Sequence, residues 1–402
     1  MSKLNKLIQE LCPNGVEYRK LGEVCELNRG VRVVKKDLSE NGIFPVYQNS
    51  LTPLGYYDKS NYPSNTTFVI SAGAAGEIGF AEKAIWAADD CLCVTCPDNI
   101  SNKYVYYCLM NNKTFLFSKV RRASVPRLSR VAVEQFPLPL PPLPIQEEIV
   151  KILDRFAEYT AELQAELQAR KEQYEYYRNL LLTNNFAYGS ADDKQKITGN
   201  ARGEWKWMTL GEVGTFTRGN GLQKKDFTES GVPCIHYGQI YTYYGTSTEK
   251  TKSFCSPELA RKLRKAKYGD LVIATTSENV DDVCKSVVYL GKEEACVSSD
   301  AFIYSHNQNP KYIGYFFQTY FFQKQKLPYI TGTKVMRISD KALSKIQIPI
   351  PPLAEQQRIV SILDKFEALV SDLTQGLPAE IAASQERYEY YRDKLLRFER
   401  CN

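Results

Sequence analysis

Apolar residues recur at helical spacing in two long segments of the chain. From about residue 143 to residue 183 the sequence has no Gly or Pro after Pro144, and its apolar side chains keep to one face. They are Ile149, Ile152, Leu153, Phe156, Leu163, Leu167, Tyr174, Tyr177 and Leu181. A helix of about 40 residues is roughly 60 Å long and needs a partner helix. The same pattern returns from Ile359 to Val370 and from Tyr388 to Leu395, which predicts that this second segment is the partner. Gly376 and Pro378 predict an interruption there, with Pro378 suited to the first turn of a new helix.

Shorter apolar runs between Gly, Pro and Asn turns fill the segments before each predicted helix. This pattern is typical of mixed domains with strand-rich centres. A short helix over residues 2 to 11 precedes the first of them. The predicted domains are a first recognition domain with its N-terminal helix at 1–137, a central helical spacer at 138–185, a linker at 186–204, a second recognition domain at 205–347 and a C-terminal helical spacer at 348–402.

Three segments of the sequence occur twice. They are Leu138–Phe156 with Ile348–Phe366, Tyr174–Arg178 with Tyr388–Arg392, and Leu21–Val24 with Leu210–Val213. Their offsets are 210, 214 and 189 residues, so the second globular segment is about 21 residues longer, with the insertion before Asp300. A tandem duplication predicts a pseudo-two-fold architecture in which one scaffold is kept while two faces diverge.

Composition narrows the class of protein only modestly. The 402 residues suffice for two or three domains, and 52 Lys+Arg against 46 Asp+Glu give a charge of +6, which permits a polyanionic partner without requiring one. The eleven cysteines show no paired spacing and indicate reduced thiols. No apolar run reaches the roughly 18 to 20 residues that cross a membrane. We therefore expect a soluble cytoplasmic protein without a membrane partner.

The duplicated motifs resemble those of one protein family. The doubled hinge Pro-Pro-Leu-x-x-Gln-x-x-Ile, the segment Gly376–Glu380 and the two Tyr-Glu-Tyr-Tyr-Arg motifs resemble the specificity subunit of type I restriction-modification systems over essentially the whole chain. The resemblance implies an α/β fold with two target-recognition domains in tandem repeat, separated by two long antiparallel helices that form a coiled-coil spacer. It also implies that each domain reads one half of a bipartite, asymmetric site on double-stranded DNA. Two methyltransferase subunits dock on such a scaffold, and two ATP-driven restriction subunits join for cleavage.

The resemblance further implies a chain without catalysis of its own. The Asn/Asp-Pro-Pro-aromatic motif of an adenine methyltransferase and a Gly-x4-Gly-Lys-Ser/Thr phosphate loop do not occur in the sequence. We expect no cofactor on this chain, with S-adenosylmethionine and ATP on partner subunits. The alternative is a coiled-coil assembly scaffold that binds proteins rather than DNA. A fused restriction enzyme would need catalytic motifs that the sequence lacks.

The densest basic clusters, two of which lie in corresponding repeat positions, are the candidates for phosphate contact, which gives salt-dependent affinity without reading sequence. The alternative for each cluster is a solvated surface. The candidates are Lys35, Lys36, Arg121, Arg122, Arg127, Lys224, Lys225, Lys262, Arg264, Lys265, Lys334 and Arg337.

Base reading requires donors and acceptors that match base edges, such as an amide side chain to adenine. Gln48 and Asn49 follow a Gly-x-x-Pro turn in the first repeat, and His236, Tyr237 and Gln239 follow a matching Gly-x-Pro turn in the second. Different side chains at corresponding positions are what two different half-sites would need. Ordinary loop hydrogen bonding is the alternative.

Three further motifs are expected to be structural. Ser71–Gly79 lacks the Lys-Ser/Thr of a phosphate loop and predicts a tight turn or a close backbone approach. Cys91, Cys93 and Cys96 lack a fourth ligand at zinc spacing, so we expect buried thiols and no metal. The tyrosines of the two Tyr-Glu-Tyr-Tyr-Arg motifs are expected to pack the helix pair or to dock the methyltransferase.

An immediate repeat within the first long helix predicts how the spacer of the DNA site is set. Ala161–Gln164 is followed by the same four residues at Ala165–Gln168, and four residues of helix span about 6 Å, against roughly 3.4 Å per base pair of DNA. Deleting Ala165–Gln168 is therefore expected to shorten the unspecified spacer between the half-sites, as measured by genome-wide mapping of methylated adenine. An unchanged spacer would reject the hypothesis.

Overall fold

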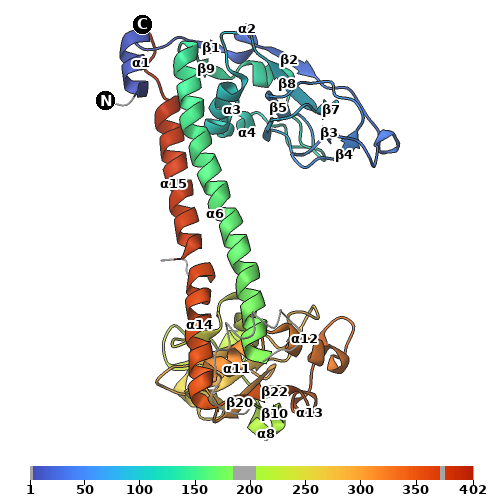
Figure 1. The fold of residues 1–402 in the computed structure, drawn as a ribbon, viewed down its shortest axis with the longest axis vertical. Coiled ribbons are helices and arrows are strands. Elements are labelled where there is room, and N and C mark those ends of the chain that lie inside the picture. Colours follow the sequence, from blue (N-terminus) through green and yellow to red (C-terminus); the bar gives the residue numbers. More distant parts are fainter. Residues whose placement is uncertain (1–2, 184–204, 372–375, 402) are drawn as a thin grey trace. The chain divides into compact units, whose positions relative to one another are not determined.

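The computed structural model describes residues 3–183, 205–371 and 376–401 (Figure 1). The chain divides into two compact units, the first formed by Met1–Gln164 with Glu380–Asn402 and the second by Ala165–Ala379. The domain limits predicted above follow chain order, whereas the compact units are interleaved along the chain. The predicted linker, residues 186–204, lies outside the described residues.

The first unit is built around an antiparallel four-stranded sheet. Its strand order is β2 (Glu26–Arg29), β8 (Cys91–Thr95), β5 (Thr66–Ile70), β6 (Ile78–Ala81). The smaller sheets are β4 (Gly55–Tyr57), β3 (Phe44–Tyr47), β7 (Trp86–Ala87), and the pair β1 (Tyr18–Lys20) with β9 (Pro137–Pro139). The helices are α1 (Lys3–Leu11), α2 (Leu21–Val24), η1 (Lys35–Asp37), α3 (Asn102–Asn111), α4 (Lys113–Ser118) and α5 (Arg130–Glu134). All residues of β5 are buried, so this central strand lies in the core.

The second unit repeats this plan with additions. Its main sheet has the order β11 (Gly214–Arg218), β20 (Ala301–His306), β16 (Leu271–Ala274), β18 (Ser286–Tyr289), β13 (Ser247–Thr248). A second sheet has the order β14 (Ser253–Cys255), β12 (Val232–Ile235), β19 (Ala295–Val297), β15 (Lys265–Ala266), and two pairs join β17 (Thr276–Ser277) to β21 (Met336–Arg337) and β10 (Lys206–Thr209) to β22 (Gln347–Ile350). The helices are α8 (Leu210–Val213), η2 (Lys224–Asp226), α9 (Tyr237–Thr242), α10 (Pro257–Ala260), α11 (Pro310–Phe316), α12 (Tyr320–Lys326), η3 (Leu327–Tyr329), α13 (Asp340–Leu343) and α14 (Leu353–Ser371).

The matching strands locate most of the insertion that the sequence offsets predict. The offset between repeats is 188 residues where Tyr47 of β3 corresponds to Ile235 of β12, because both end a strand paired in parallel with β7 or β19. It is 204 where Ser71 corresponds to Thr275, the residue after the central strand. Most of the insertion therefore lies between β12 and β16, where the second unit adds α9, β13 and α10, whereas β14 pairs with β12 as β4 pairs with β3.

A buried glutamine fixes the start of each long helix to its globular core. Gln146, in the first turn of α6 (Leu143–Thr183), accepts a hydrogen bond from the amide of Ser101 (2.9 Å) and donates one to the carbonyl of Pro141 (2.8 Å). Gln356 of α14 does the same with the amide of Asn309 (2.9 Å) and the carbonyl of the corresponding hinge proline (2.8 Å). Both side chains are buried, so the doubled Gln of the hinge motif is a structural residue.

Eight residues, or about two turns, further along each helix, an aspartate joins the helix to the domain that it follows. Asp154 accepts hydrogen bonds from the hydroxyl of Tyr107 (2.6 Å) and pairs with Lys103 (2.9 Å). Asp364 is held in the same way by Tyr315 (2.6 Å) and by the lysine at the start of α11 (3.0 Å). The two frames are therefore alike in their polar contacts as well as in their sequence.

The far ends of the helices pack in the opposite unit to their own repeat. Tyr177, from the motif of the first repeat, lies 5.5 Å from the ring of Phe366 in the second unit. Tyr391, from the motif of the second repeat, stacks on Phe156 at 5.2 Å in the first unit, where α15 (Leu377–Leu396) runs antiparallel to α6. The predicted packing of the motif tyrosines between helices is confirmed for this pair of contacts. Each unit is completed by a helix end from the other half of the chain.

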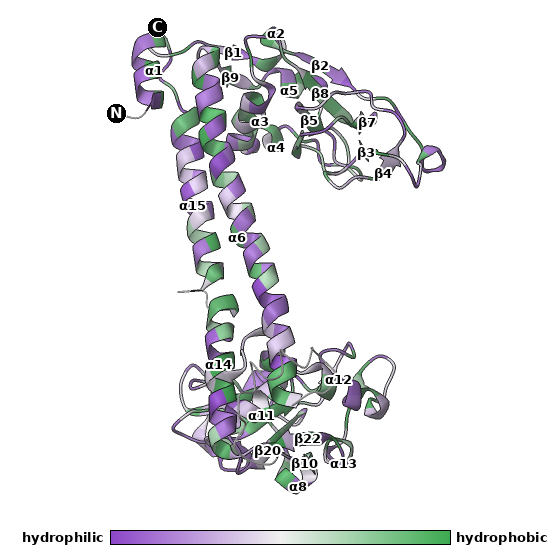
Figure 2. Ribbon diagram, in the orientation of Figure 1, coloured by the Kyte–Doolittle hydropathy of each residue, from purple (hydrophilic) through white to green (hydrophobic). Residues whose placement is uncertain are grey.

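The second helical segment is interrupted where Gly376 and Pro378 predict it. Gly376 lies in a bend outside the helix and α15 begins at Leu377, which places Pro378 in its first turn; residues 372–375 lie outside the described residues. Figure 2 shows polar and apolar residues alternating along α6 and α15, as expected of helices that bury one face.

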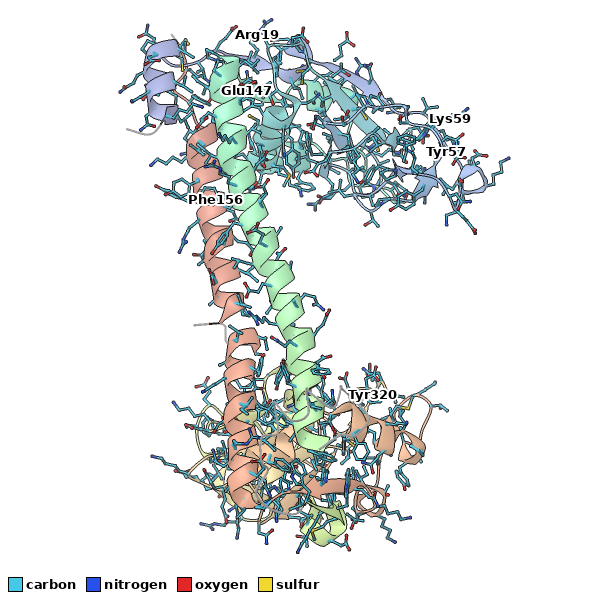
Figure 3. The ribbon with its side chains drawn as sticks, in the orientation of Figure 1. Arg19, Tyr57, Lys59, Glu147, Phe156 and Tyr320 are labelled. Atoms are coloured by element: carbon cyan, nitrogen blue, oxygen red, sulfur yellow. The ribbon has the colours of Figure 1, made fainter. Side chains whose placement is uncertain are left out.

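Replacing Gln146 by Leu is expected to lower the stability of the first unit. The buried amide of Ser101 and the carbonyl of Pro141 would each lose a partner, at a cost of about 1 to 3 kcal/mol per group. Urea unfolding followed by circular dichroism measures the effect. The control is Glu147→Leu at the exposed neighbour labelled in Figure 3. Equal midpoints for the two variants would contradict the role given to Gln146.

Candidate nucleic-acid interface

In both units the first strand of the main sheet ends in an exposed arginine. Arg29 ends β2 and Arg218 ends β11, and the offset of 189 residues is that of the Leu-Gly-Glu-Val motif. The Nε of Arg218 donates to the carbonyl of Ser299 (2.8 Å), and its guanidinium lies 3.7 Å from the carboxylate of Asp300. Sequence reasoning did not single out this pair, although the doubled Arg-Gly dipeptide was a signal that could have found it.

The glycine after each arginine is required by a close backbone approach. A Cβ at Gly30 would lie 2.2 Å from the carbonyl oxygen of Ala87, and a Cβ at Gly219 would lie 2.2 Å from that of Ser298. Contacts this short with backbone cannot be relieved by a side-chain rotation. The chain therefore turns away from the main sheet at the same place in both units, so Arg29 and Arg218 occupy equivalent positions at the ends of β2 and β11.

Two loops that carry predicted phosphate contacts are closed in the same manner. We call residues 121–127 the first Arg loop and residues 331–337 the second Arg loop. Arg121 and Arg127 exchange two backbone hydrogen bonds (2.8 and 3.1 Å), and Thr331 and Arg337 exchange the equivalent pair (2.9 and 2.8 Å). All residues of both loops are exposed except the one before the closing arginine, which is half-buried. The predicted contacts Arg121, Arg122, Arg127, Lys334 and Arg337 are therefore accessible to a ligand.

Each Arg loop is attached to the residue that follows the central strand. The amide of Leu128 donates to the carbonyl of Ser71 (2.8 Å), and the amide of Ile338 donates to that of Thr275 (3.3 Å). The amides of Ser71 and Thr275 in turn donate to the carbonyl of the aspartate immediately before β8 (2.7 Å) or β20 (2.9 Å). The loops, the strand ends and these turns thus form one connected surface in each unit.

In the first unit the glycine-rich segment and Asn49 join this surface. The amide of Gly73 donates to the carbonyl of Pro126 in the first Arg loop (3.2 Å), and the amide of Ala74 donates to the carbonyl of Asn49 (2.9 Å). Gly73 has a φ of 82°, so the predicted tight turn is confirmed. The side chain of Asn49 is exposed and that of Gln48 is half-buried. The structure brings Asn49 beside the Arg loop, and base reading by Gln48 and Asn49 stays a prediction.

The three base-reading candidates of the second unit, His236, Tyr237 and Gln239, form hydrogen bonds within that unit. The Nδ1 of His236 accepts from the amide of Gly238 (3.2 Å) and caps α9. Gln239 accepts from the amide of His236 (3.1 Å) and donates to the hydroxyl of Ser253 (2.7 Å). The amide of the half-buried Tyr237 donates to the hydroxyl of a serine in the turn after β19 (2.9 Å). Base contact by these residues stays a prediction, and their present contacts position the start of α9.

Electrostatics keep His236 neutral near pH 7. Burial lowers its pKa, and the nearby charge of Lys224 lowers it further, while Asp300 acts in the opposite direction. A neutral imidazole can accept one hydrogen bond and donate another, as its capping role requires.

The doubled Lys-Lys-Asp motif forms the same short turn in both units. Lys35 and Lys36 lie in η1, and Lys224 and Lys225 lie in η2. The aspartate that closes each turn accepts a hydrogen bond from the backbone amide three residues earlier. All four lysine side chains are exposed, so these charges are accessible in equivalent places.

Of the three predicted phosphate contacts in the basic run before β16, Arg264 is the one whose side chain is bonded to Arg218. Arg264 donates to the backbone carbonyl of Arg218 (2.6 Å), which brings it into the cluster. Lys265 is half-buried and lies 3.9 Å from Glu294, which offsets part of its charge, and Lys262 is exposed. Arg264 is therefore the best-placed of the three predicted phosphate contacts.

Most cysteines of the described residues are buried in the core, whereas Cys12 and Cys96 are half-buried and Cys401 is exposed. Cys91 and Cys93 are buried in β8, as predicted, and burial raises the pKa of Cys93 to about 12. Cys96 is half-buried, with its Sγ 3.3 Å from that of Cys25. Within residues 3–183, 205–371 and 376–401, no three His, Cys, Asp or Glu side chains are grouped as a metal site would need. Across the same ranges, no helix has the length and apolarity that a bilayer crossing would need.

Comparison with known proteins identifies the family to which this duplicated chain belongs. The family model "Type I restriction modification DNA specificity domain" matches residues 13–194 and again residues 202–383. The chain therefore belongs to this family, and it is a specificity subunit of the type I restriction-modification kind with two tandem specificity domains.

Individual relatives agree over nearly the full length. The chain is 31% identical over 403 residues to a putative type I restriction enzyme specificity subunit of Haemophilus influenzae, covering 95% of this chain and 96% of that protein. It is 32% identical over 422 residues to a type I restriction enzyme specificity subunit of Escherichia coli, covering 99% and 97%. The crystal structure of the S subunit of a type I system from M. genitalium has the same fold, with a TM-score of 0.55 at 14% identity and coverage of 95% and 96%. Subunits of this kind are not the catalytic subunits of their systems, in keeping with the sequence prediction.

Replacing Gly219 by Ala is expected to destabilise the second unit and displace Arg218. The added methyl would meet the backbone of Ser298 and force the chain to shift, at a cost of about 1 to 3 kcal/mol. Gly245→Ala is the matched control, because a Cβ at Gly245 meets nothing within 4 Å. Thermal unfolding compares the two, and a Gly219→Ala protein as stable as the control would contradict the close approach.

Proposed function

We propose that this chain supplies the sequence specificity of a type I restriction-modification complex by binding a bipartite site on double-stranded DNA. The globular domain of each unit reads one half-site. One observation carries the proposal: the two Arg loops are closed by the same backbone bonds on the same frame, yet they present different side chains. A frame that is kept while its exposed loop changes suits two readers of two different sequences.

Within each surface we assign different tasks to constant and variable residues. Exposed basic side chains at equivalent positions, such as Lys35 and Lys224, would contact phosphates and fix the register of the protein. Exposed loop side chains that differ between the units and are not predicted phosphate contacts, such as Ala123 against Thr333, would carry the base preference. Asn49 in the first unit belongs to this second group.

The partners follow from the same duplication. We propose that two methyltransferase subunits dock on the two equivalent hinge and helix surfaces, that two restriction subunits join them, and that the helices set the spacer. The exposed motif tyrosines Tyr176 and Tyr390 occupy equivalent positions and are available for such docking. S-adenosylmethionine and ATP would be bound by the partners, this chain would hold no cofactor, and the complex would act in the cytoplasm.

Genome-wide mapping of methylated adenine tests the function directly. A strain carrying the chain with a type I methyltransferase subunit is compared with the same strain lacking only the chain. A split motif with an unspecified spacer is expected to appear only in the first strain, because specificity resides in the chain.

The assembly-scaffold alternative predicts a different outcome. Methylation would then be the same in both strains, and the purified complex would show no binding to duplex DNA that weakens steeply with salt. That combination of results would refute the DNA-reading role.

A further inference from the structure

We propose that each unit holds one DNA backbone phosphate between the arginine that ends its first strand and the arginine that closes its Arg loop. The pairs are Arg29 with Arg127 in the first unit and Arg218 with Arg337 in the second. The inference rests on the proposed DNA-binding function and assigns a place and a chemical group to part of that contact.

In the second unit both arginines line one open pocket. Arg218 reaches it from the end of β11 and Arg337 from the base of the second Arg loop, and the hydroxyl-bearing Thr275, Thr276 and Thr331 line the same pocket. A phosphate diester offers two charged oxygens, which match the parallel N–H groups of a guanidinium. Two guanidinium groups with nearby hydroxyl donors therefore form a site suited to one phosphate.

The acidic groups at this pocket do not cancel its positive charge. Asp340 lines the pocket, and the carboxylate of Asp300 lies 3.7 Å from the guanidinium of Arg218, beyond hydrogen-bonding distance. The side chain of Arg218 remains 60% exposed, and although its Nε donates to the carbonyl of Ser299, its terminal N–H groups are still available to a ligand. Arg264, bonded to the backbone of Arg218, adds a third positive charge beside the pocket.

The first unit has the same frame with more positive charge. The carbonyl of Ser71 binds its Arg loop as Thr275 does in the second unit, and Arg121 stands where the second unit has Thr331. Arg130 corresponds to Asp340, although its guanidinium pairs with Glu134 at 2.6 Å. The constant members in both units are Arg29 or Arg218 and the arginine that closes the loop.

This constancy is the reason for choosing phosphate rather than a base as the ligand. The two half-sites of an asymmetric target differ in sequence, so a residue kept in the same place in both units has no base in common to read. The sugar-phosphate backbone is what both half-sites share. The doubled arginines therefore fit the backbone, and the variable loop residues remain for the bases.

The test compares Arg218→Ala, Arg218→Lys and the control Lys292→Ala in the complex of the full chain with its methyltransferase subunit. Lys292 is exposed in the same unit and does not line the pocket, so its loss changes the charge equally. The probe is a pool of DNA duplexes with a randomised central segment, bound over a range of KCl concentrations and then sequenced. Arg218→Ala is expected to weaken binding roughly tenfold and to lower the log–log salt slope by about one, without changing the sequences selected. Arg218→Lys should keep the slope, and Lys292→Ala should match the wild type.

Three results would overturn the inference. They are an unchanged slope for Arg218→Ala, an equal loss of slope for Lys292→Ala, and a change in the bases selected by Arg218→Ala, which would make Arg218 a base reader. The first unit gives an independent check, because Arg29→Ala should lower the slope by a similar amount. If the wild-type complex selects no sequence from the pool, the proposed function itself fails; if it selects one and Arg218→Ala keeps the full slope, only the phosphate site is rejected.

Discussion

The buried amide of the hinge glutamine is the contact on which each half of the molecule depends. The hinge contains two prolines, which have no N–H to donate, so its carbonyl groups need donors from elsewhere. Gln146 and Gln356 supply one donor to a hinge carbonyl and one acceptor to the loop before α3 or α11. A single side chain thus joins the hinge after the last strand of a globular domain, the N-cap of α3 or α11 and the start of the long helix. The domain and the helix cannot shift independently without leaving buried polar groups unpaired.

The exchange of helix ends makes each unit depend on both repeats. The first unit needs residues after Glu380 to complete its core, since Tyr388 and Leu396 pack there and Tyr391 stacks on Phe156. In the same unit, the amide of Val16 donates to the carbonyl of Glu399 (2.9 Å), a residue near the other end of the chain. Contacts so distant in sequence carry a large loop-closure entropy and slow the formation of the native core. The two repeats are therefore expected to fold together rather than as two independent domains.

Much of the frame could be predicted from the sequence because it depends on periodic or duplicated residues. The helices followed from apolar spacing, and the interruption before Leu377 followed from Gly376 and Pro378. The exchange of helix ends could not be predicted, since the two Tyr-Glu-Tyr-Tyr-Arg motifs are identical and either could pack in either unit. At the candidate site, Gln239 has the amide of a base reader, but only the structure shows that its side-chain oxygen accepts from His236 and its nitrogen donates to Ser253. Arg29 and Arg218 were overlooked because one arginine after a strand is common, and its significance lies in the matching turn.

The two surfaces differ in a way that affects how each contributes to binding. The first Arg loop carries Arg121 and Arg122 in addition to its closing arginine, whereas the second has Thr331 and Gly332 at those positions. Charge attracts any phosphate, and this attraction is weakened by salt, whereas hydroxyl and amide contacts depend on the position of a particular partner atom. If both loops lie on DNA, the first unit supplies more of the affinity that is common to all sequences, and the second depends more on matching its half-site. The same backbone hydrogen bonds hold both Arg loops in place whichever side chains the loops carry. Duplication thus allows the two units of one chain to differ in how much of their DNA binding comes from charge and how much from contacts specific to a sequence.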